Sequence, residues 1–327
     1  MPCGEARLGA MNIGLPERTA RFRADLAALA GPAPAAFGVA VSGGPDSLAL
    51  LLLAEAAFPG RIEAATVDHG LRPESAAEAA LVAEICAARA IPHATLTGPP
   101  VEGNVQAGAR ALRYELLGGW ARERGLGFVL TAHHRDDQAE TLLMRLQRGA
   151  GLAGLAGIRP RAEIGGLTVF RPLLGWSRAE LAAIVAGAGL VPVEDPSNRD
   201  ERYDRARLRR QLGGADWLDA AALARSAAAL EEAEEALDWT VGQLIAERVE
   251  PVLDGLSFDA AGLPPELRRR ALLRLLALLV PADPPRGEAV TRLLAALDAG
   301  EVATLAGVRC QGGPVWQLAP APPRRSA

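Results

Sequence analysis

Apolar segments alternate with amphipathic segments along the first two thirds of the chain. Short runs rich in branched and aromatic residues, bounded by Gly, Pro or Asp, predict buried strands, and the longer runs between them have the apolar spacing of helices. The predicted strands are residues 37–42, 62–67, 93–97, 127–132 and a short segment near 168–170. The predicted helices are residues 46–58, 73–90, 104–124, 136–148 and 177–188. This alternation is typical of a parallel β-sheet with helices on both faces, an α/β fold.

The pattern changes after residue 212. Leucines recur seven residues apart from 223 to 237, which predicts one long helix with an apolar seam and an acidic face. Beyond Pro251, two more helices and a hairpin around Gly312 and Gly313 predict a smaller, mostly helical domain. We therefore expect five segments: an N-terminal extension and helix (1–36), the α/β domain (37–212), a linker helix (213–250), a helical C-terminal domain with a terminal hairpin (251–318) and a disordered tail (319–327).

The composition of the chain, its net charge and its cysteines exclude several classes of protein. The chain has 327 residues, of which 50% are hydrophobic and 23% charged, and its net charge is −4. This charge argues against a non-specific nucleic-acid coat, although a local basic patch is compatible with it. No apolar run reaches the roughly 18 residues of a membrane span, and the start is too polar for a signal peptide, whether Met1 or Met11 begins the chain. We expect a soluble, cytoplasmic protein. The scattered Cys3, Cys86 and Cys310 exclude a disulfide framework and a cysteine-rich metal cluster.

The sequence S-G-G-P-D-S, residues 42–47, follows the first predicted strand and opens the first helix of the sheet. Such a turn attracts anions through backbone N–H groups and the helix N-terminus. All 35 basic residues are arginine, so the loop lacks the lysine of the commonest phosphate-binding motif. Asp46 stands where it can cap the helix or hold a Mg²⁺ that bridges phosphates. The alternative is an ordinary tight turn with a capped helix. The predicted phosphate-binding residues are Ser42, Gly43, Gly44, Pro45, Asp46 and Ser47.

Other polar residues follow two further strands. Ligands of an open parallel sheet bind at the carboxyl ends of its strands. Asp68 and His69 come after the second strand, and Thr131 lies at the end of the fourth. Because these ends share one edge of the sheet with residues 42–47, we expect all of them to face one ligand.

The helix after the fourth strand begins with a cluster of acidic residues. Asp137 and Glu140 are three residues apart, so their carboxylates can share one helical face and bind Mg²⁺ or a polar substrate. Carboxylates here also suit the helix dipole, which is the alternative explanation. Of the two adjacent histidines we favour His133 as the group that hydrogen-bonds an attacking or leaving atom. On the preceding helix, Arg113 is a candidate for neutralising phosphate, or else an ordinary surface arginine.

Six arginines lie between residues 199 and 210. In a chain of negative net charge this is a concentrated basic segment, and nucleic-acid phosphates are its natural partners. The alternative is a solvated helix whose arginines pair with neighbouring acidic residues. The predicted nucleic-acid contacts are Arg202, Arg205, Arg207 and Arg209.

Together these motifs resemble, in order, those of the tRNA(Ile)-lysidine synthetases. The resemblance covers about residues 37–212. It is carried by residues 42–47, 67–72 (V-D-H-G-L-R), 113–114 (R-Y), 133–141 (H-H-R-D-D-Q-A-E-T), 146–157, 171–174 (R-P-L-L), 194–198 (E-D-P-S-N) and 205–210. It implies a PP-loop ATP pyrophosphatase domain, of the adenine nucleotide alpha hydrolase type, whose loop holds the pyrophosphate of ATP without a lysine.

The resemblance also implies a two-step reaction. The wobble cytidine of an isoleucine tRNA with a CAU anticodon attacks the α-phosphate of ATP, and free L-lysine then displaces AMP. It implies Mg²⁺, for which Asp46 and Asp137 are the candidate ligands, and leaves a homodimer open. The implied catalytic residues are Asp46, Arg113, His133, Asp137 and Glu140. The implied ATP-binding residues are 42–47, Asp68, His69 and Thr131.

Three other functions stay open at this point. A cytidine tRNA thiolase of the same fold needs reactive thiolates, and the cysteines of this chain are scattered. A synthetase or amidotransferase of the same superfamily would act on a substrate other than RNA. An ATP-dependent RNA-binding protein without catalysis would need neither the carboxylates nor His133.

Overall fold

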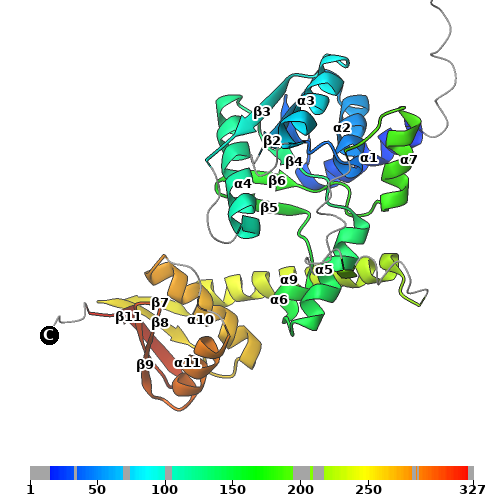
Figure 1. Ribbon diagram of the computed structural model, residues 1–327. Helices are drawn as coiled ribbons and strands as arrows, with labels where there is room; N and C mark the ends of the chain where they lie inside the picture. The colour runs from blue at the N-terminus through cyan, green and yellow to red at the C-terminus, as the bar shows by residue number, and fades with distance from the viewer. Residues whose placement is uncertain are drawn as a thin grey trace, which may run out of the picture. The chain divides into compact units, whose positions relative to one another are not determined.

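A computed structural model describes residues 15–32, 35–68, 74–99, 105–193, 207–208, 217–281, 285 and 287–322. The chain divides into two compact units, Met1–Glu231 and Glu232–Ala327. One long helix, α9 (Ala220–Arg248), supplies residues to both units (Figure 1). No described helix has the length and apolar content needed to cross a membrane.

The first unit is built on a six-stranded sheet with the order β3-β2-β1-β4-β6-β5. All neighbouring strands are parallel except the β5–β6 pair. The strands are β1 (Phe37–Ala40), β2 (Ile62–Asp68), β3 (His93–Thr97), β4 (Val129–Leu130), β5 (Arg161–Ile164) and β6 (Leu167–Phe170). The chain progresses from β1 to β3 on one side and continues through β4 and β6 on the other. The switch point, where such sheets bind ligands, is therefore between β1 and β4.

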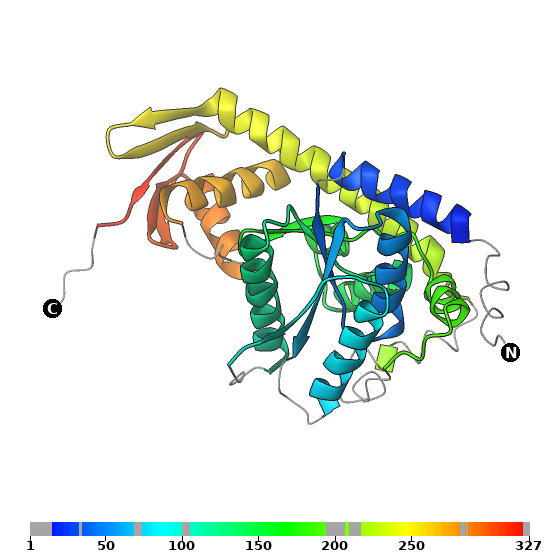
Figure 2. The same ribbon diagram turned by 90° about the horizontal axis from the view of Figure 1, so that it is seen from above.

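Helices cover both faces of this sheet, as the apolar pattern predicts. The helices are α1 (Leu15–Ala30), α2 (Pro45–Ala57), α3 (Glu74–Ala87), α4 (Val105–Glu123), α5 (Arg135–Gln147), α6 (Leu152–Leu155) and α7 (Arg178–Gly187). Helices α1, α2, α3 and α7 contribute to one buried apolar cluster with β1, whereas α4 packs its Leu117 and Trp120 against the other face. Figure 2 shows α4 on one side of the strands and α2 and α3 on the other. The predicted fold class is confirmed.

The edge strand β5 was not predicted. It pairs with β6, and the turn between the two strands is formed by Gly165 and Gly166, whose φ angles are +58° and +78°. A two-residue turn with both φ angles positive is the usual connection of a tight hairpin, and glycine adopts it without strain. The dense glycines of this region indicated a loop, and the two that form this turn were not recognised as a hairpin signal.

The second unit contains a five-stranded antiparallel sheet with the order β7-β8-β11-β10-β9. Its strands are β7 (Val249–Val252), β8 (Gly255–Asp259), β9 (Val302–Leu305), β10 (Val308–Gln311) and β11 (Val315–Pro320). Two helices, α10 (Pro265–Leu279) and α11 (Glu288–Asp298), pack on it around a core that includes Phe258 and Trp316.

Sequence reasoning found only part of this second sheet. The predicted hairpin is the β10–β11 pair, with Gly312 and Gly313 between the strands. The other three strands were missed, so the unit contains more sheet than the mostly helical domain we expected. Pro251 had suggested a break, yet it lies in the edge strand β7, where a missing N–H is tolerated. Strand β11 extends to Pro320, into the segment predicted as a tail.

Candidate functional site

The phosphate loop, by which we mean residues 42–47, joins β1 to α2. Gly43 has a φ of +84°, a conformation that favours glycine. Gly44 is the N-cap of α2 and supplies no side chain to cap the helix. The first-turn N–H groups of α2 are thus the kind of donors that hold phosphate oxygens.

The two serines of the phosphate loop make hydrogen bonds within the loop. The Ser42 N–H donates to the Ser47 hydroxyl oxygen (3.1 Å), and the Ser47 hydroxyl donates to the Gly44 carbonyl oxygen (2.9 Å). Ser47 is buried, whereas Ser42 is exposed. The loop is therefore held in one shape by its own side chains.

A segment far along the chain supports the phosphate loop from outside. The Val193 N–H donates to the Gly43 carbonyl oxygen at 2.9 Å. A Cβ atom at Gly43 would lie 3.0 Å from Val193 Cγ2. Sequence reasoning singled out residues 194–198 but not Val193, which immediately precedes them; a lone valine in a loop gives no signal.

Across the switch point from the phosphate loop lies the start of α5. His134 is the N-cap of this helix and is completely buried. Its Nε2 is 3.3 Å from Asp46 Oδ2 and 3.6 Å from Asp137 Oδ2. Sequence reasoning chose His133 and missed His134, because adjacent histidines look equivalent until the N-cap geometry turns one of them inward.

The acidic residues of α5 have partners within the chain. Asp137 Oδ2 accepts the His134 N–H (3.0 Å) and completes the helix cap. Asp136 Oδ2 accepts the backbone N–H of Arg178 (3.0 Å) at the start of α7. Glu140 is buried, with Oε1 3.3 Å from Arg178 Nη2. Arg178, which sequence reasoning missed, thus joins α7 to the predicted site.

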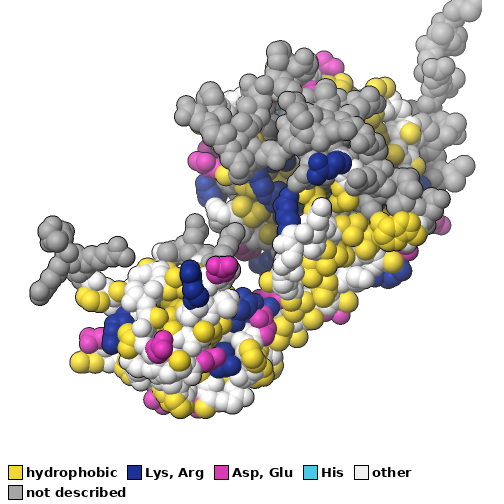
Figure 3. Space-filling view, turned by 60° about the horizontal axis from the view of Figure 1, so that its bottom comes forward, with side chains coloured by type: hydrophobic (Ala, Val, Ile, Leu, Met, Phe, Trp, Pro, Cys, Tyr) yellow, Lys and Arg dark blue, Asp and Glu magenta, His cyan; other side chains and the backbone are white. Residues whose placement is uncertain are grey.

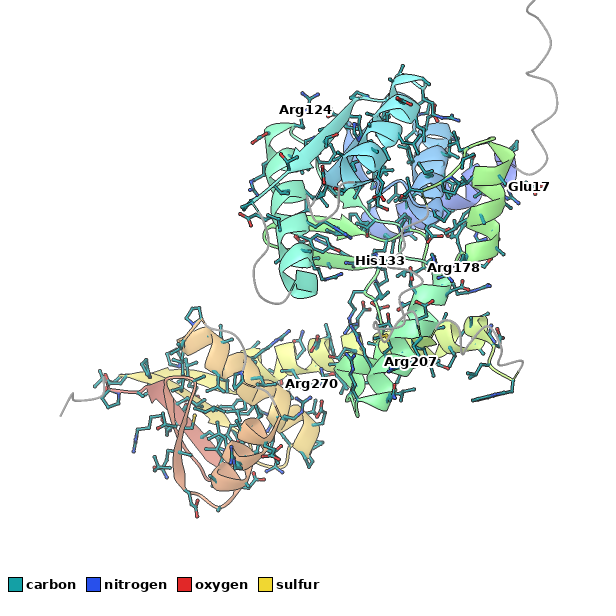
Figure 4. The ribbon with its side chains drawn as sticks, in the orientation of Figure 1. Glu17, Arg124, His133, Arg178, Arg207 and Arg270 are labelled. Carbon is teal, nitrogen blue, oxygen red and sulfur yellow. The ribbon has the colours of Figure 1, made fainter. Side chains whose placement is uncertain are left out.

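The remaining predicted residues of this edge are half-buried or buried. Thr131 Oγ1 lies 3.2 Å from His133 Nδ1, and Figure 4 shows His133 where the chain leaves β4 for α5. Asp68 Oδ1 accepts a hydrogen bond from the Ser75 hydroxyl (2.6 Å), which connects the end of β2 to α3. His69 lies outside the described residues. The structure thus brings Asp68, Thr131 and His133 to the carboxyl edge of the sheet.

The predicted arginines are described only in part. Arg113 lies on α4 and is exposed, as is Arg207. Arg202, Arg205 and Arg209 lie outside the described residues. Figure 3 shows arginine side chains, in dark blue, at several separate places on the face that it presents.

The donor set of the site fits a magnesium ion bound together with phosphates. No group of three or more potential metal-ligating side chains occurs among the described residues. Mg²⁺ typically takes only one or two protein carboxylates and completes its shell with water and phosphate oxygens. Asp46 offers such a ligand, because within the described part of the chain its Oδ1 is buried and accepts no hydrogen bond.

The two described cysteines are both buried. Cys86 is buried in α3 and Cys310 in β10, one in each unit. Burial raises the pKa of each thiol to about 11. Neither has the lowered pKa of a reactive thiolate.

Comparison with known proteins agrees with this geometry. Residues 18–215 match a family model described as a PP-loop domain. The chain is 45% identical to a tRNA(Ile)-lysidine synthase of Zymomonas mobilis, over 91% of this chain and 92% of that protein. It is 48% identical to a protein of the same name from Novosphingobium aromaticivorans, over 94% of both chains.

A similar fold occurs in a solved structure of a U34-tRNA thiolase from Methanococcus maripaludis with its [4Fe-4S] cluster. The two structures match with a TM-score of 0.55 over 67% of this chain and 78% of the thiolase. Their sequences are only 17% identical, so this likeness concerns the fold alone.

Proposed function

Because the chain belongs to the tRNA(Ile)-lysidine synthases, we propose that it uses ATP to join free lysine to the wobble cytidine of an isoleucine tRNA with a CAU anticodon. The observation that carries this proposal is the meeting of the phosphate loop with the start of α5 at the switch point, where Asp46 and His134 are 3.3 Å apart. ATP and a base of the tRNA would meet at this edge of the sheet.

The first step activates the base. Cytosine O2 attacks the α-phosphorus of ATP, the bond from that phosphorus to the bridging oxygen breaks, and pyrophosphate leaves. The product is a cytidine whose O2 carries AMP. A carbonyl oxygen is a poor leaving group, whereas the oxygen of a phosphate ester is a good one, which is the physical reason for using ATP.

The phosphate loop would hold the pyrophosphate part of ATP in this step. The first-turn N–H groups of α2 would donate to its oxygens. The exposed Ser42 hydroxyl, which donates to Ser47 Oγ across 3.3 Å in the structure, would turn to the pyrophosphate instead. Asp46 is the proposed Mg²⁺ ligand, on the strength of its buried Oδ1. The ion would neutralise charge on the phosphates as pyrophosphate leaves.

The second step forms the carbon–nitrogen bond. The ε-amine of lysine attacks C2 of the cytosine, the C2–O2 bond breaks and AMP leaves, while the amine loses a proton. His133, at the edge of the sheet, is the proposed acceptor of this proton. Glu140 and Asp137 are proposed to attract the ammonium group of lysine.

Their observed contacts limit how these two carboxylates act. Asp137 caps α5 through one oxygen, and Glu140 is buried beside Arg178. Both are held in place before the substrate binds, which favours roles in orienting lysine over roles that require a side chain to move.

Thiolation of tRNA is the alternative that the fold alone would allow. That chemistry requires thiolates or a cysteine-bound cluster. Cys86 and Cys310 lie in different units, and both thiols have raised pKa values. These observations favour lysidine formation.

The test is an incubation of the chain with ATP, Mg²⁺, free lysine and a CAU-anticodon isoleucine tRNA. We expect AMP release that depends on lysine and a gain in tRNA mass of one lysine less water. Asp46→Asn should lower AMP formation at least about 100-fold, because it removes the negative charge that would hold Mg²⁺ against the phosphates. Pyrophosphate release without incorporation of lysine would contradict the proposal, and a mass gain corresponding to sulfur would support the thiolase.

A further inference from the structure

One histidine of the pair after β4 lies inside the protein instead of at its edge. The backbone of His134 is extended, with φ −128° and ψ −178°, at the N-cap of α5. Its residue surface is 0% exposed, whereas His133 is half-buried. An imidazole so completely buried needs a hydrogen-bond partner to offset its loss of water. Within the described part of the chain, neither of its ring nitrogens makes a hydrogen bond.

Three carboxylates surround this ring. Nε2 is 3.3 Å from Asp46 Oδ2 and 3.6 Å from Asp137 Oδ2, and Nδ1 is 3.7 Å from Asp136 Oδ2. Asp136 and Asp137 already accept backbone N–H groups, of Arg178 and His134 respectively. Asp46 is the nearest of the three and belongs to a different loop. The imidazole thus connects the two sides of the switch point.

The two oxygens of Asp46 have different surroundings. Oδ2 faces the His134 ring, while Oδ1 is buried and accepts no hydrogen bond within the described part of the chain. Imidazole–carboxylate contacts of this kind orient side chains that bind metal ions, and losing them typically reduces metal affinity or activity by about 10- to 100-fold. A carboxylate held through one oxygen keeps the other available to a ligand.

We propose that His134 is a positioning residue. Its Nε2 makes no hydrogen bond within the described part of the chain and would take Asp46 Oδ2, 3.3 Å away, as its acceptor, fixing Asp46 so that Oδ1 remains available to the ligand of the phosphate loop. The inference rests on the proposed function, because it assumes that the ligand is ATP with Mg²⁺. It adds a residue that sequence reasoning passed over and that acts through Asp46, without touching the substrate.

The test measures ATP binding without tRNA and without turnover. Equilibrium dialysis with labelled ATP gives the dissociation constant of each variant, once with Mg²⁺ and once with EDTA. The variants are His134→Leu, which cannot donate, and His134→Gln, whose amide reaches the position of Nε2. The matched control is His93→Leu, which removes a half-buried histidine of β3. His93 Nε2 lies 2.9 Å from Thr66 Oγ1 of β2.

We expect His134→Leu to raise the dissociation constant for ATP with Mg²⁺ by about 10- to 100-fold and to leave the value in EDTA within about threefold of wild type. His134→Gln and His93→Leu should bind as wild type does in both conditions. In steady-state assays of His134→Leu, the KM for ATP should rise and the KM for lysine should stay unchanged.

Several results would overturn the inference. The first is a dissociation constant of His134→Leu for ATP with Mg²⁺ that equals the wild-type value. The second is an equal rise of this constant in EDTA, and the third is an equal rise in His93→Leu. If His134→Leu does not fold, His134→Gln is compared with His134→Asn, whose amide reaches the Nδ1 position instead; equal binding by these two would overturn it as well. Failure of the wild-type chain to bind ATP would instead contradict the proposed function.

Discussion

The backbone N–H of Val193 donates to the carbonyl oxygen of Gly43 across 2.9 Å, so the segment before residues 194–198 is attached to the phosphate loop. Gly43 has a positive φ, and Val193 Cγ2 would lie 3.0 Å from any Cβ atom placed there. Two independent features, backbone conformation and close contact, therefore require glycine at this position.

We predict that Gly43→Ala destabilises the chain by about 1–2 kcal/mol, the usual cost of a left-handed conformation for a residue with a Cβ atom. Chemical denaturation measures this change. Gly44→Ala is the matched control, because Gly44 has a φ of −72° and a Cβ there would come no closer than 3.7 Å to another atom of the structure. Equal losses of stability in the two variants would contradict the assignment.

The local sequence predicted the elements that position the site but not the contacts between them. Strand β3 was predicted at its observed bounds, 93–97, and the phosphate loop and the start of α5 were found because their polar residues directly follow apolar strands. The contact of His134 with Asp46 joins residues far apart in sequence, and it depends on which ring the N-cap turns inward. No local pattern encodes that choice.

In the second unit, the local sequence pattern failed to predict some of the strands themselves. Strands β7 and β8 form a hairpin in which Pro251 interrupts the apolar alternation and Leu253 is fully exposed. The pairing of β8 with β11 brings Phe258 opposite Trp316, although two helices and two strands lie between them in the sequence. Such non-local pairing stabilises strands that are weak by local pattern alone.

Arg270 of α10 is buried in the second unit and donates to both carboxylate oxygens of Glu234, at 2.8 and 2.5 Å. Its hydrogen bond with Glu234 is the first cause that raises the pKa of Arg270. We predict that Arg270→Met costs about 3–5 kcal/mol of unfolding free energy, because it leaves the buried carboxylate of Glu234 without its main partner. Denaturation with urea, followed by a probe in the second unit, measures this cost.

The neighbouring arginine is the control for that prediction. Arg269 also binds a carboxylate through two nitrogens, at 2.7 and 2.6 Å from Glu266, but its side chain is 38% exposed. Arg269→Met should therefore cost about 1 kcal/mol or less. Similar costs for the two variants would show that burial does not decide the strength of these ion pairs.

The raised pKa values of the cysteines predict slow alkylation. With pKa values of about 11, only about 0.1% of each thiol is ionised at pH 8, since every unit between the pH and the pKa lowers the thiolate fraction tenfold. In a Cys3→Ala background, iodoacetamide should leave Cys86 and Cys310 unmodified in the folded chain and modify both in denaturant. Mass spectrometry counts the modified sites. Rapid modification of either thiol in the folded chain would contradict the burial and reopen the thiolase alternative.

The basic segment predicts a salt-dependent contribution to tRNA binding. Arg207 is exposed in the structure. Each arginine that contacts a phosphate releases bound counterions, so its loss should reduce the slope of log affinity against log salt concentration by about 0.7–0.9. We expect Arg207→Ala to weaken tRNA binding several-fold and to lower the slope by about this amount. Filter binding across a series of salt concentrations measures both quantities.

Arg124 provides a control with the same change of charge. It follows α4 and donates to both carboxylate oxygens of Glu63, at 2.8 and 3.0 Å. Figure 4 places it at the edge of the first unit away from His133. Arg124→Ala should leave the salt slope unchanged if Arg207 acts through direct contact with phosphate. An equal reduction in both variants would mean that total charge, and not a specific basic segment, attracts the tRNA.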